Sequence, residues 1–305
     1  MRTSTDTYPT FAYLSGALLG AGLLFLSVGC GPSARNELPD AKQGKLDAPV
    51  VPTDATVDTE SRVYAHTADR LYRIDTTTNQ PVEIGEITGI GSDSITDIAV
   101  DKNENIIGIS INKLYKIDRT TAAATLIREV PIGATGFTSL SYVPMNLDDR
   151  NSAERLVAAN NDGEVFAIDP TTGVATPIGS YGMSGNKPIG SSGDIVAVYG
   201  AGIYATVNVG STNTDREKPD YIAKINPVTW KATLPASDTG YDRIFGLAYW
   251  KGKVYGFVDV PAVAGGMRTG KFIEMNPDAG TAIERSTNVQ AWFGAGVTTV
   301  APTIE

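Results

Sequence analysis

The chain of 305 residues carries 25 Lys plus Arg against 34 Asp plus Glu, a formal net charge of -9. An acidic surface disfavours nucleic acid and anionic lipid as partners, because it offers no basic patch to displace counterions from phosphates. The sequence holds one cysteine and one histidine, which excludes an intrachain disulfide and a zinc site with several Cys or His ligands.

Residues 1–29 have the pattern of an export signal: a weakly basic start is followed by an apolar run from Phe11 to Val28. The run ends in Ser27-Val28-Gly29-Cys30. This ending resembles the lipobox of bacterial lipoproteins, although Ser27 stands where that family prefers Leu. The alternative interpretation is an uncleaved anchor helix, because the run is near the length that spans a bilayer.

The lipobox resemblance implies that Cys30 is lipid-modified and becomes the mature N-terminus, anchored in the bacterial cell envelope. Gly31 follows the cysteine in place of Asp, which in the enteric lipoproteins implies the outer membrane, with a periplasmic or surface-facing domain. Residues 30–58 are rich in Pro, Asp, Ala and Thr and hold no aromatic residue. This composition predicts a disordered linker.

From residue 59 onward the chain is built of repeats. The segments LYRIDTTT, LYKIDRTT, VFAIDPTTG, IAKINPVTW and FIEMNPDAG each end an alternating apolar stretch in Asp or Asn, and these anchors lie 43 to 57 residues apart. The five anchor residues are Asp75, Asp118, Asp169, Asn226 and Asn276. A repeat of this length made of strands is typical of a propeller blade.

The anchors are interpreted as structural. Asp or Asn directly after a strand accepts backbone N–H bonds and closes an Asx turn. A residue with positive φ then completes the hairpin loop, and Gly173 and Gly280 suit that position.

Each full unit contains four apolar segments, such as ITDIAV, NIIGISI, KLYKID and ATLIREV in the second unit. The first unit lacks its first segment, and a matching segment, WFGAGVTTV, stands at the C-terminus from Trp292. The sequence therefore predicts an all-β propeller of five four-stranded blades over residues 59–305, closed by a C-terminal strand that completes blade 1.

These repeats resemble the bacterial secreted propellers with LYxIDxxTG motifs, related in style to the YVTN and quinoprotein-like propellers. The resemblance implies a fold and no particular activity. A quinone cofactor is not implied, because the three tryptophans do not supply one for each blade.

Long loops are predicted on one face of blades 4 and 5, at residues 180–192, 208–220 and 259–270. Such loops are either recognition surfaces or mobile, solvated segments. The candidate binding rim comprises Tyr181, Lys187, Asp215, Arg216, Lys218 and Arg268.

Asp97 and Asp194 begin the inner strands of blades 2 and 4, near the predicted channel mouth. They are weak candidates for a central Ca²⁺ site, and solvated carboxylates in a water-filled channel are the preferred interpretation. His66 is expected to be a packed strand residue, since no motif ties it to a nucleophile.

The sequence thus predicts a lipid-anchored propeller of the cell envelope that binds a protein or glycan. It predicts no catalysis and no required cofactor. The alternative is a calcium-dependent lactonase-like hydrolase or a polysaccharide-active enzyme that uses carboxylates at the channel mouth.

Overall fold

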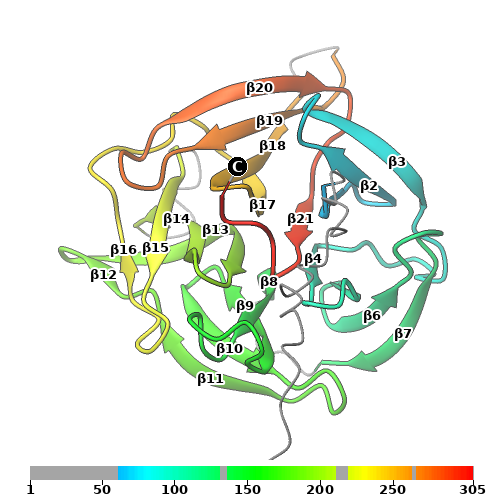
Figure 1. Ribbon diagram of the computed structural model, residues 1–305, viewed down its shortest axis with the longest axis horizontal. Coiled ribbons are helices and arrows are strands. Elements are labelled where there is room, and N and C mark those ends of the chain that lie inside the picture. The colour runs from blue at the N-terminus through cyan, green and yellow to red at the C-terminus, as the bar shows by residue number, and fades with distance from the viewer. Residues whose placement is uncertain (1–60, 131–135, 211–218, 263–265, 305) are drawn as a thin grey trace, which may run out of the picture. The chain divides into compact units, whose positions relative to one another are not determined.

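Five antiparallel β-sheets surround a common axis as the blades of a propeller (Figure 1). The computed structural model describes residues 61–130, 136–210, 219–262 and 266–304. The predicted signal peptide, the predicted lipid attachment residue Cys30 and the predicted linker 30–58 lie outside the described residues. Within the described part of the chain, no helix has the length and apolar character needed to cross a membrane.

The blades follow one another in chain order around the axis (Figure 1). Blade 1 contains β21 (Gly294–Val297), β1 (Val63–His66), β2 (Arg70–Asp75) and β3 (Gln80–Glu86). Blade 2 contains β4 (Asp97–Val100), β5 (Ile106–Ile109), β6 (Lys113–Ile117) and β7 (Ala124–Glu129). Blade 3 contains β8 (Phe137–Pro144), β9 (Glu154–Asn160), β10 (Glu164–Ile168) and β11 (Ala175–Ser180).

Blade 4 contains β12 (Met183–Ser184), β13 (Lys187–Val198), β14 (Gly202–Val209), β15 (Tyr221–Ile225) and β16 (Ala232–Thr233). Blade 5 contains β17 (Ile244–Trp250), β18 (Lys253–Val260), β19 (Thr269–Met275) and β20 (Ala282–Asn288). The inner strands β21, β4, β8, β13 and β17 each contact the next around the axis.

The two ends of the described chain close the ring. β21 pairs antiparallel with β1, and the register sets Val63 opposite Val297 and His66 opposite Gly294. The prediction that a C-terminal strand completes blade 1 is therefore confirmed. Because β21 covers the inner edge of β1, the backbone N–H and C=O groups of that edge are hydrogen-bonded and not exposed.

The five anchor residues close the turns between the third and fourth strands. Each accepts a backbone N–H from the residue two positions on, at 2.7 to 3.0 Å, as predicted for Asx turns. Gly173 and Gly280 have positive φ as expected, and Asn79, Ala122 and Trp230 take the equivalent position in the other blades. The repeated carboxylates and amides are thus bound within their own turns.

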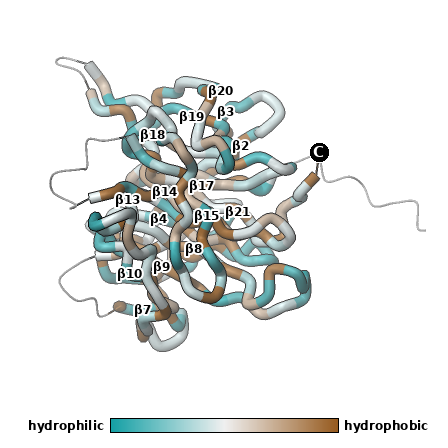
Figure 2. Tube along the Cα trace, turned by 90° about the vertical axis from the view of Figure 1, so that its left-hand side faces the viewer, coloured by the Kyte–Doolittle hydropathy of each residue, from teal (hydrophilic) through white to brown (hydrophobic). Residues whose placement is uncertain are grey.

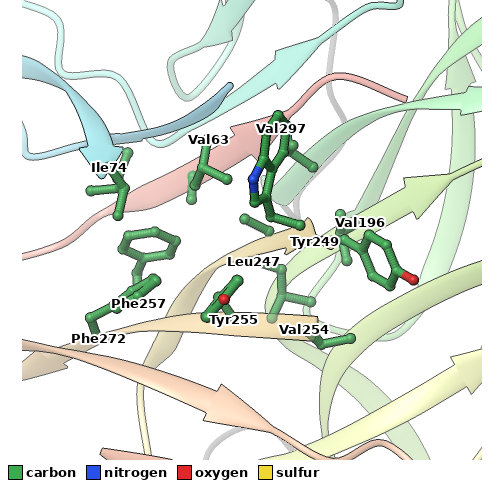
Figure 3. Packing of buried hydrophobic residues seen from close by; sticks show 14 of the residues in the cluster. Val63, Ile74, Val196, Leu247, Tyr249, Val254, Tyr255, Phe257, Phe272 and Val297 are labelled. Atoms are coloured by element: carbon green, nitrogen blue, oxygen red, sulfur yellow. The ribbon is translucent and has the colours of Figure 1, made fainter. Parts of the chain in front are cut away.

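Apolar (brown) and polar (teal) residues are interspersed along the chain (Figure 2), and buried apolar side chains meet between neighbouring blades. One cluster of buried side chains joins blade 5 to blades 1 and 4 (Figure 3). It includes Phe257 from β18, which packs edge-on against Trp292 with ring centroids 5.5 Å apart. Separate clusters fill the spaces between blades 1 and 2, 2 and 3, and 3 and 4.

Blade 4 departs from the predicted pattern on one face. The segment predicted as a long loop, residues 180–192, forms a hairpin in which Met183 and Ser184 pair with Pro188 and Lys187. β13 then continues through a bulge between Ser191 and Ile195 into the ring.

Candidate functional site

A pocket of about 340 Å³ lies at one mouth of the central channel. We call it the channel-mouth pocket. All five blades contribute to it, because the residues that precede or begin their inner strands converge there. Its lining residues are Thr96, Phe137, Thr138, Asn161, Ser191, Ser192, Gly193, Asn208, Asp220, Asp242, Arg243, Phe245 and Phe293. Pockets of about 300 to 1,000 Å³ with a few convergent polar groups are the usual size for small-ligand sites.

Hydrogen-bond acceptors gather on the wall formed by blade 4. Asn208 near the end of β14 is 6% exposed, and its Oδ1 has no hydrogen-bond partner among the described residues. Asp220 directly precedes β15 and is 1% exposed. The register pairs Val207 with Tyr221, so the next position of this antiparallel pair sets Asn208 opposite Asp220 on the same face.

A second carboxylate approaches Asp220 from blade 5. Asp220 Oδ2 accepts the backbone N–H of Ile244 at 3.0 Å, and Asp242 Oδ1 accepts the backbone N–H of Arg243 at 2.9 Å. The two carboxyl groups are therefore bound to consecutive peptide groups. Burial, with a smaller contribution from the charge of Asp242, raises the pKa of Asp220 to about 8, while the hydrogen bond from the Ile244 N–H opposes the shift. Asp220 is thus mainly protonated at neutral pH.

Beside the pocket, two arginines form ion pairs with one buried carboxylate. Asp259 in β18 is 1% exposed and accepts from Arg243 Nε at 2.8 Å and from Arg268 Nε at 3.0 Å. Both guanidinium groups also cover aromatic rings of the pocket: Arg243 lies 4.9 Å from the Phe245 centroid and Arg268 lies 5.5 Å from the Phe293 centroid. These contacts fix the phenylalanines at the mouth.

Below the pocket, Asp97 and Asp194 meet across the axis. Each is fully buried, and the two side chains are hydrogen-bonded to each other. Burial raises the pKa of both groups well above the ordinary carboxyl value, and the hydrogen bond between them favours a proton shared by the pair. The expectation of solvated carboxylates in a water-filled channel is therefore wrong, because the inner strands close around them.

The carboxylate pair does not fit a calcium ion. Asp97 accepts the backbone N–H groups of Ile98 and Leu140, and Asp194 accepts those of Ile195 and Leu247, at 2.6 to 2.9 Å. Their oxygens are thus directed at N–H donors, whereas Ca²⁺ needs six to eight oxygen ligands. Within the described ranges, no group of three or more His, Cys, Asp and Glu residues is arranged to hold a metal ion.

His66 is also fully buried at this level. Its Nδ1 lies 2.8 Å from the carbonyl oxygen of Thr67, to which it can donate as the neutral tautomer. Burial lowers the pKa of His66 to about 4. Its Nε2 and Asp97 Oδ1 lie 2.5 and 2.3 Å from the position that a Cβ on Gly294 would occupy, so this glycine keeps both groups in place.

The candidate rim residues fall in different surroundings. Asp215, Arg216 and Lys218 lie outside the described residues. Tyr181 is 1% exposed in the core between blades 3 and 4, so its assignment to a surface rim is wrong. Lys187 is exposed at the start of β13, away from the lining of the channel-mouth pocket. Of the rim residues that the structure describes, Arg268 is the one that reaches the pocket, where its guanidinium group covers Phe293.

Sequence reasoning missed the acceptor wall, although it named the segment that carries it. Asn208 and Asp220 are the two ends of a predicted loop, whereas the predicted binding rim takes the charged residues between them. Their positions in the repeat could have identified them. Asn208 lies near the end of β14 and Asp220 lies directly before β15, so both are at the end of the blade that lines the channel-mouth pocket.

No protein-family model and no curated protein matches this sequence. Among solved structures, a protein of unknown function from Bacteroides thetaiotaomicron is 14% identical, with a TM-score of 0.43; the match covers 64% of this chain and 53%, about half, of that one. A protein of unknown function from Bacteroides caccae is 8% identical, with a TM-score of 0.41 and coverage of 78% and 98%.

A chain of a nidogen/laminin complex is 11% identical, with a TM-score of 0.46 and coverage of 80% and 98%. These likenesses are too distant to bear on function. The assignment of the propeller fold follows from the strand order and ring closure of this chain itself.

Proposed function

We propose that this protein is a lipid-anchored module of the bacterial cell envelope, held by Cys30, that binds the end of a glycan in the channel-mouth pocket. The observation that carries the proposal is the unpartnered, buried Oδ1 of Asn208 in a pocket that also presents phenylalanine rings. A buried polar atom without a partner costs free energy, and a ligand hydroxyl would remove that cost.

The pocket's composition suits a sugar. Phe137, Phe245 and Phe293 offer aromatic surface to the C–H faces of a pyranose ring, since the face of an aromatic ring is electron-rich. Asn161, Asn208 and Ser192 offer donors and acceptors for hydroxyl groups. A concave site of this size favours a terminal group, whereas a protein partner usually needs a contact of about 800 Å² on each side.

The test is direct binding of the full chain, purified in detergent, to an immobilised panel of neutral, acidic and amino oligosaccharides. We expect a subset of glycans to be retained, and Phe245→Ala to abolish that retention. Tyr204→Ala is the control, because Tyr204 stacks on Tyr249 and neither residue lines the pocket. Retention that both variants leave unchanged, or no retention at all, contradicts the proposal.

One observation favours a second candidate, hydrolysis of a polysaccharide. Asp220 holds a proton at neutral pH beside the carboxylate of Asp242, and such a pair can serve as acid and base. Asp220 would give its proton to the leaving glycosidic oxygen, while Asp242 would take one from the attacking water. Release of reducing ends from a glycan retained in the binding assay, lost in Asp220→Asn, would support this candidate over simple binding.

A further inference from the structure

We infer that the sugar bound in the channel-mouth pocket carries a protonated amino group, seated between Asn208, Asp220 and Asp242. This inference rests on the proposed glycan-binding function and specifies its substrate class. It depends on the convergence of three acceptor side chains from two blades, which match the three donors of an ammonium group.

The geometry brings the three groups together from different directions. Asn208 and Asp220 occupy opposing positions on β14 and at the start of β15, and such cross-strand neighbours have Cβ atoms about 5 Å apart. Asp242 enters from blade 5 and shares with Asp220 the adjacent backbone N–H groups of Arg243 and Ile244. Among these three side chains, the amide oxygen of Asn208 is the atom that is buried without a hydrogen-bond partner in the described chain.

The charges that face this position favour a cation. Among the described residues, Asp220 and Asp242 lie at the site itself, and the guanidinium groups of Arg243 and Arg268 donate to Asp259. A ligand ammonium would stabilise the ionised form of Asp220, which burial and Asp242 otherwise disfavour. Binding at mildly acidic pH, where the ligand amine is already protonated, should therefore release the proton that Asp220 holds.

The experiment compares two sugars that differ only in this group. The full chain in detergent is titrated calorimetrically with a chitosan oligosaccharide, whose residues carry amines, and with the chitin oligosaccharide of equal length, in which they are acetylated. We expect the amine form to bind about tenfold more tightly or better, because charge-assisted hydrogen bonds exceed neutral ones. Equal binding, or tighter binding of the chitin form, overturns the inference and leaves the proposed glycan function intact.

Variants locate the effect. Asp242→Asn keeps an oxygen for the Arg243 N–H and removes the charge, so it should abolish the preference for chitosan. Asp162→Asn is the matched control, since Asp162 is an exposed acid on the neighbouring blade. A preference that survives Asp242→Asn overturns the inference, provided that the unfolding midpoint shows the variant to be folded.

Proton release gives an independent readout. At about pH 6 both the amine and Asp220 are largely protonated, and binding should release close to one proton, measured from the dependence of the enthalpy on the buffer. The release should disappear in Asp220→Asn. Absence of release from the unaltered chain overturns the placement of the amine at Asp220.

Two other outcomes are decisive. If neither oligosaccharide binds, the inference fails, and the panel of the preceding section decides separately on glycan binding. If a lysine-containing tripeptide displaces chitosan at equal concentration, the amine belongs to a protein partner and the glycan part of the inference is overturned.

Discussion

Asp97 and Asp194, from non-adjacent blades 2 and 4, are hydrogen-bonded to each other at the axis and together bind the inner strands of all five blades. Asp97 accepts from Leu140 in blade 3 and from Ala295 in blade 1, and Asp194 accepts from Leu247 in blade 5. The pair therefore acts as a central connection of the ring.

We expect either aspartate to be costly to remove. Asp97→Ala leaves buried N–H groups of several blades without an acceptor, at about 1 to 3 kcal/mol for each, and we expect a loss of about 3 kcal/mol in the free energy of unfolding. Asp194→Ala should lose a similar amount. Urea denaturation measures both, with the exposed Asp162→Ala as a control near zero.

The double variant tests whether the two aspartates act as one unit. Because they share a hydrogen bond and a proton, the combined loss should fall short of the sum of the single losses by about 1 kcal/mol or more. A combined loss equal to the sum would show that the two side chains are energetically independent.

Three buried carboxyl groups predict that part of the stability is lost as the pH rises. The folded-state pKa of Asp220 is about 8, above the ordinary value of 3.8, so its contribution is fully present below about pH 4 and is lost as the pH rises toward 8. Asp97 and Asp194 shift in the same direction. Asp118 opposes them, because its turn lowers its pKa to about 2 and its contribution is lost in acid.

Comparison of variants isolates Asp220. The stability of the unaltered chain relative to Asp220→Asn should fall between about pH 4 and pH 8, at no more than about 1.4 kcal/mol per pH unit. Denaturant titrations at several pH values, with Asp162→Asn as the flat control, measure this difference. A difference that does not change with pH would mean that Asp220 is ionised in the folded protein throughout.

We expect calcium to have no effect on stability. Asp97 and Asp194 direct their oxygens at backbone N–H groups and share a proton, so an ion would have to displace these bonds. Thermal unfolding of the full chain in EDTA and in added Ca²⁺ should give the same midpoint, since only a ligand of the folded state raises it. A higher midpoint in Ca²⁺ that Asp97→Asn removes would restore the calcium-centred enzyme.

Gly294 is predicted to tolerate no side chain. A Cβ there would lie 2.3 Å from Asp97 Oδ1 and 2.5 Å from His66 Nε2, and overpacking of this kind costs about 1 to 3 kcal/mol. Gly294→Ala should therefore lower the unfolding midpoint and weaken the closure of β21 on β1. Gly136→Ala is the control, because its Cβ would meet nothing within 4 Å; equal effects of the two substitutions would contradict this account.

The architecture was predictable because it repeats. Each anchor, such as Asp75 or Asn276, is followed by the same local turn, and local hydrogen bonds depend on nearby residues only. Burial at the axis was not predictable from such patterns. Tyr181 looks like a loop residue, yet the hairpin turns of Gly182 and Gly185, both with positive φ, carry the chain back over it. Asp97 looks like a solvated carboxylate until the donors of three blades are placed around it.

At Asn208, the requirements of ligand binding and of folding stability should oppose each other. Its Oδ1 is buried without a partner in the described chain, so Asn208→Ala removes an unsatisfied acceptor. We expect the free energy of unfolding to stay the same or rise by up to about 1 kcal/mol, while binding of the chitosan oligosaccharide weakens.

Asn160 provides the matched comparison at the end of β9. Its Oδ1 accepts the backbone N–H groups of Asp162 and Glu164 at 3.1 and 3.0 Å, so Asn160→Ala should destabilise the protein by about 1 to 3 kcal/mol. Calorimetric titration and urea denaturation of both variants separate the two roles. If Asn208→Ala destabilises the chain as much as Asn160→Ala does, its side chain serves the fold, and the acceptor wall loses the residue that distinguishes it from an ordinary acidic surface.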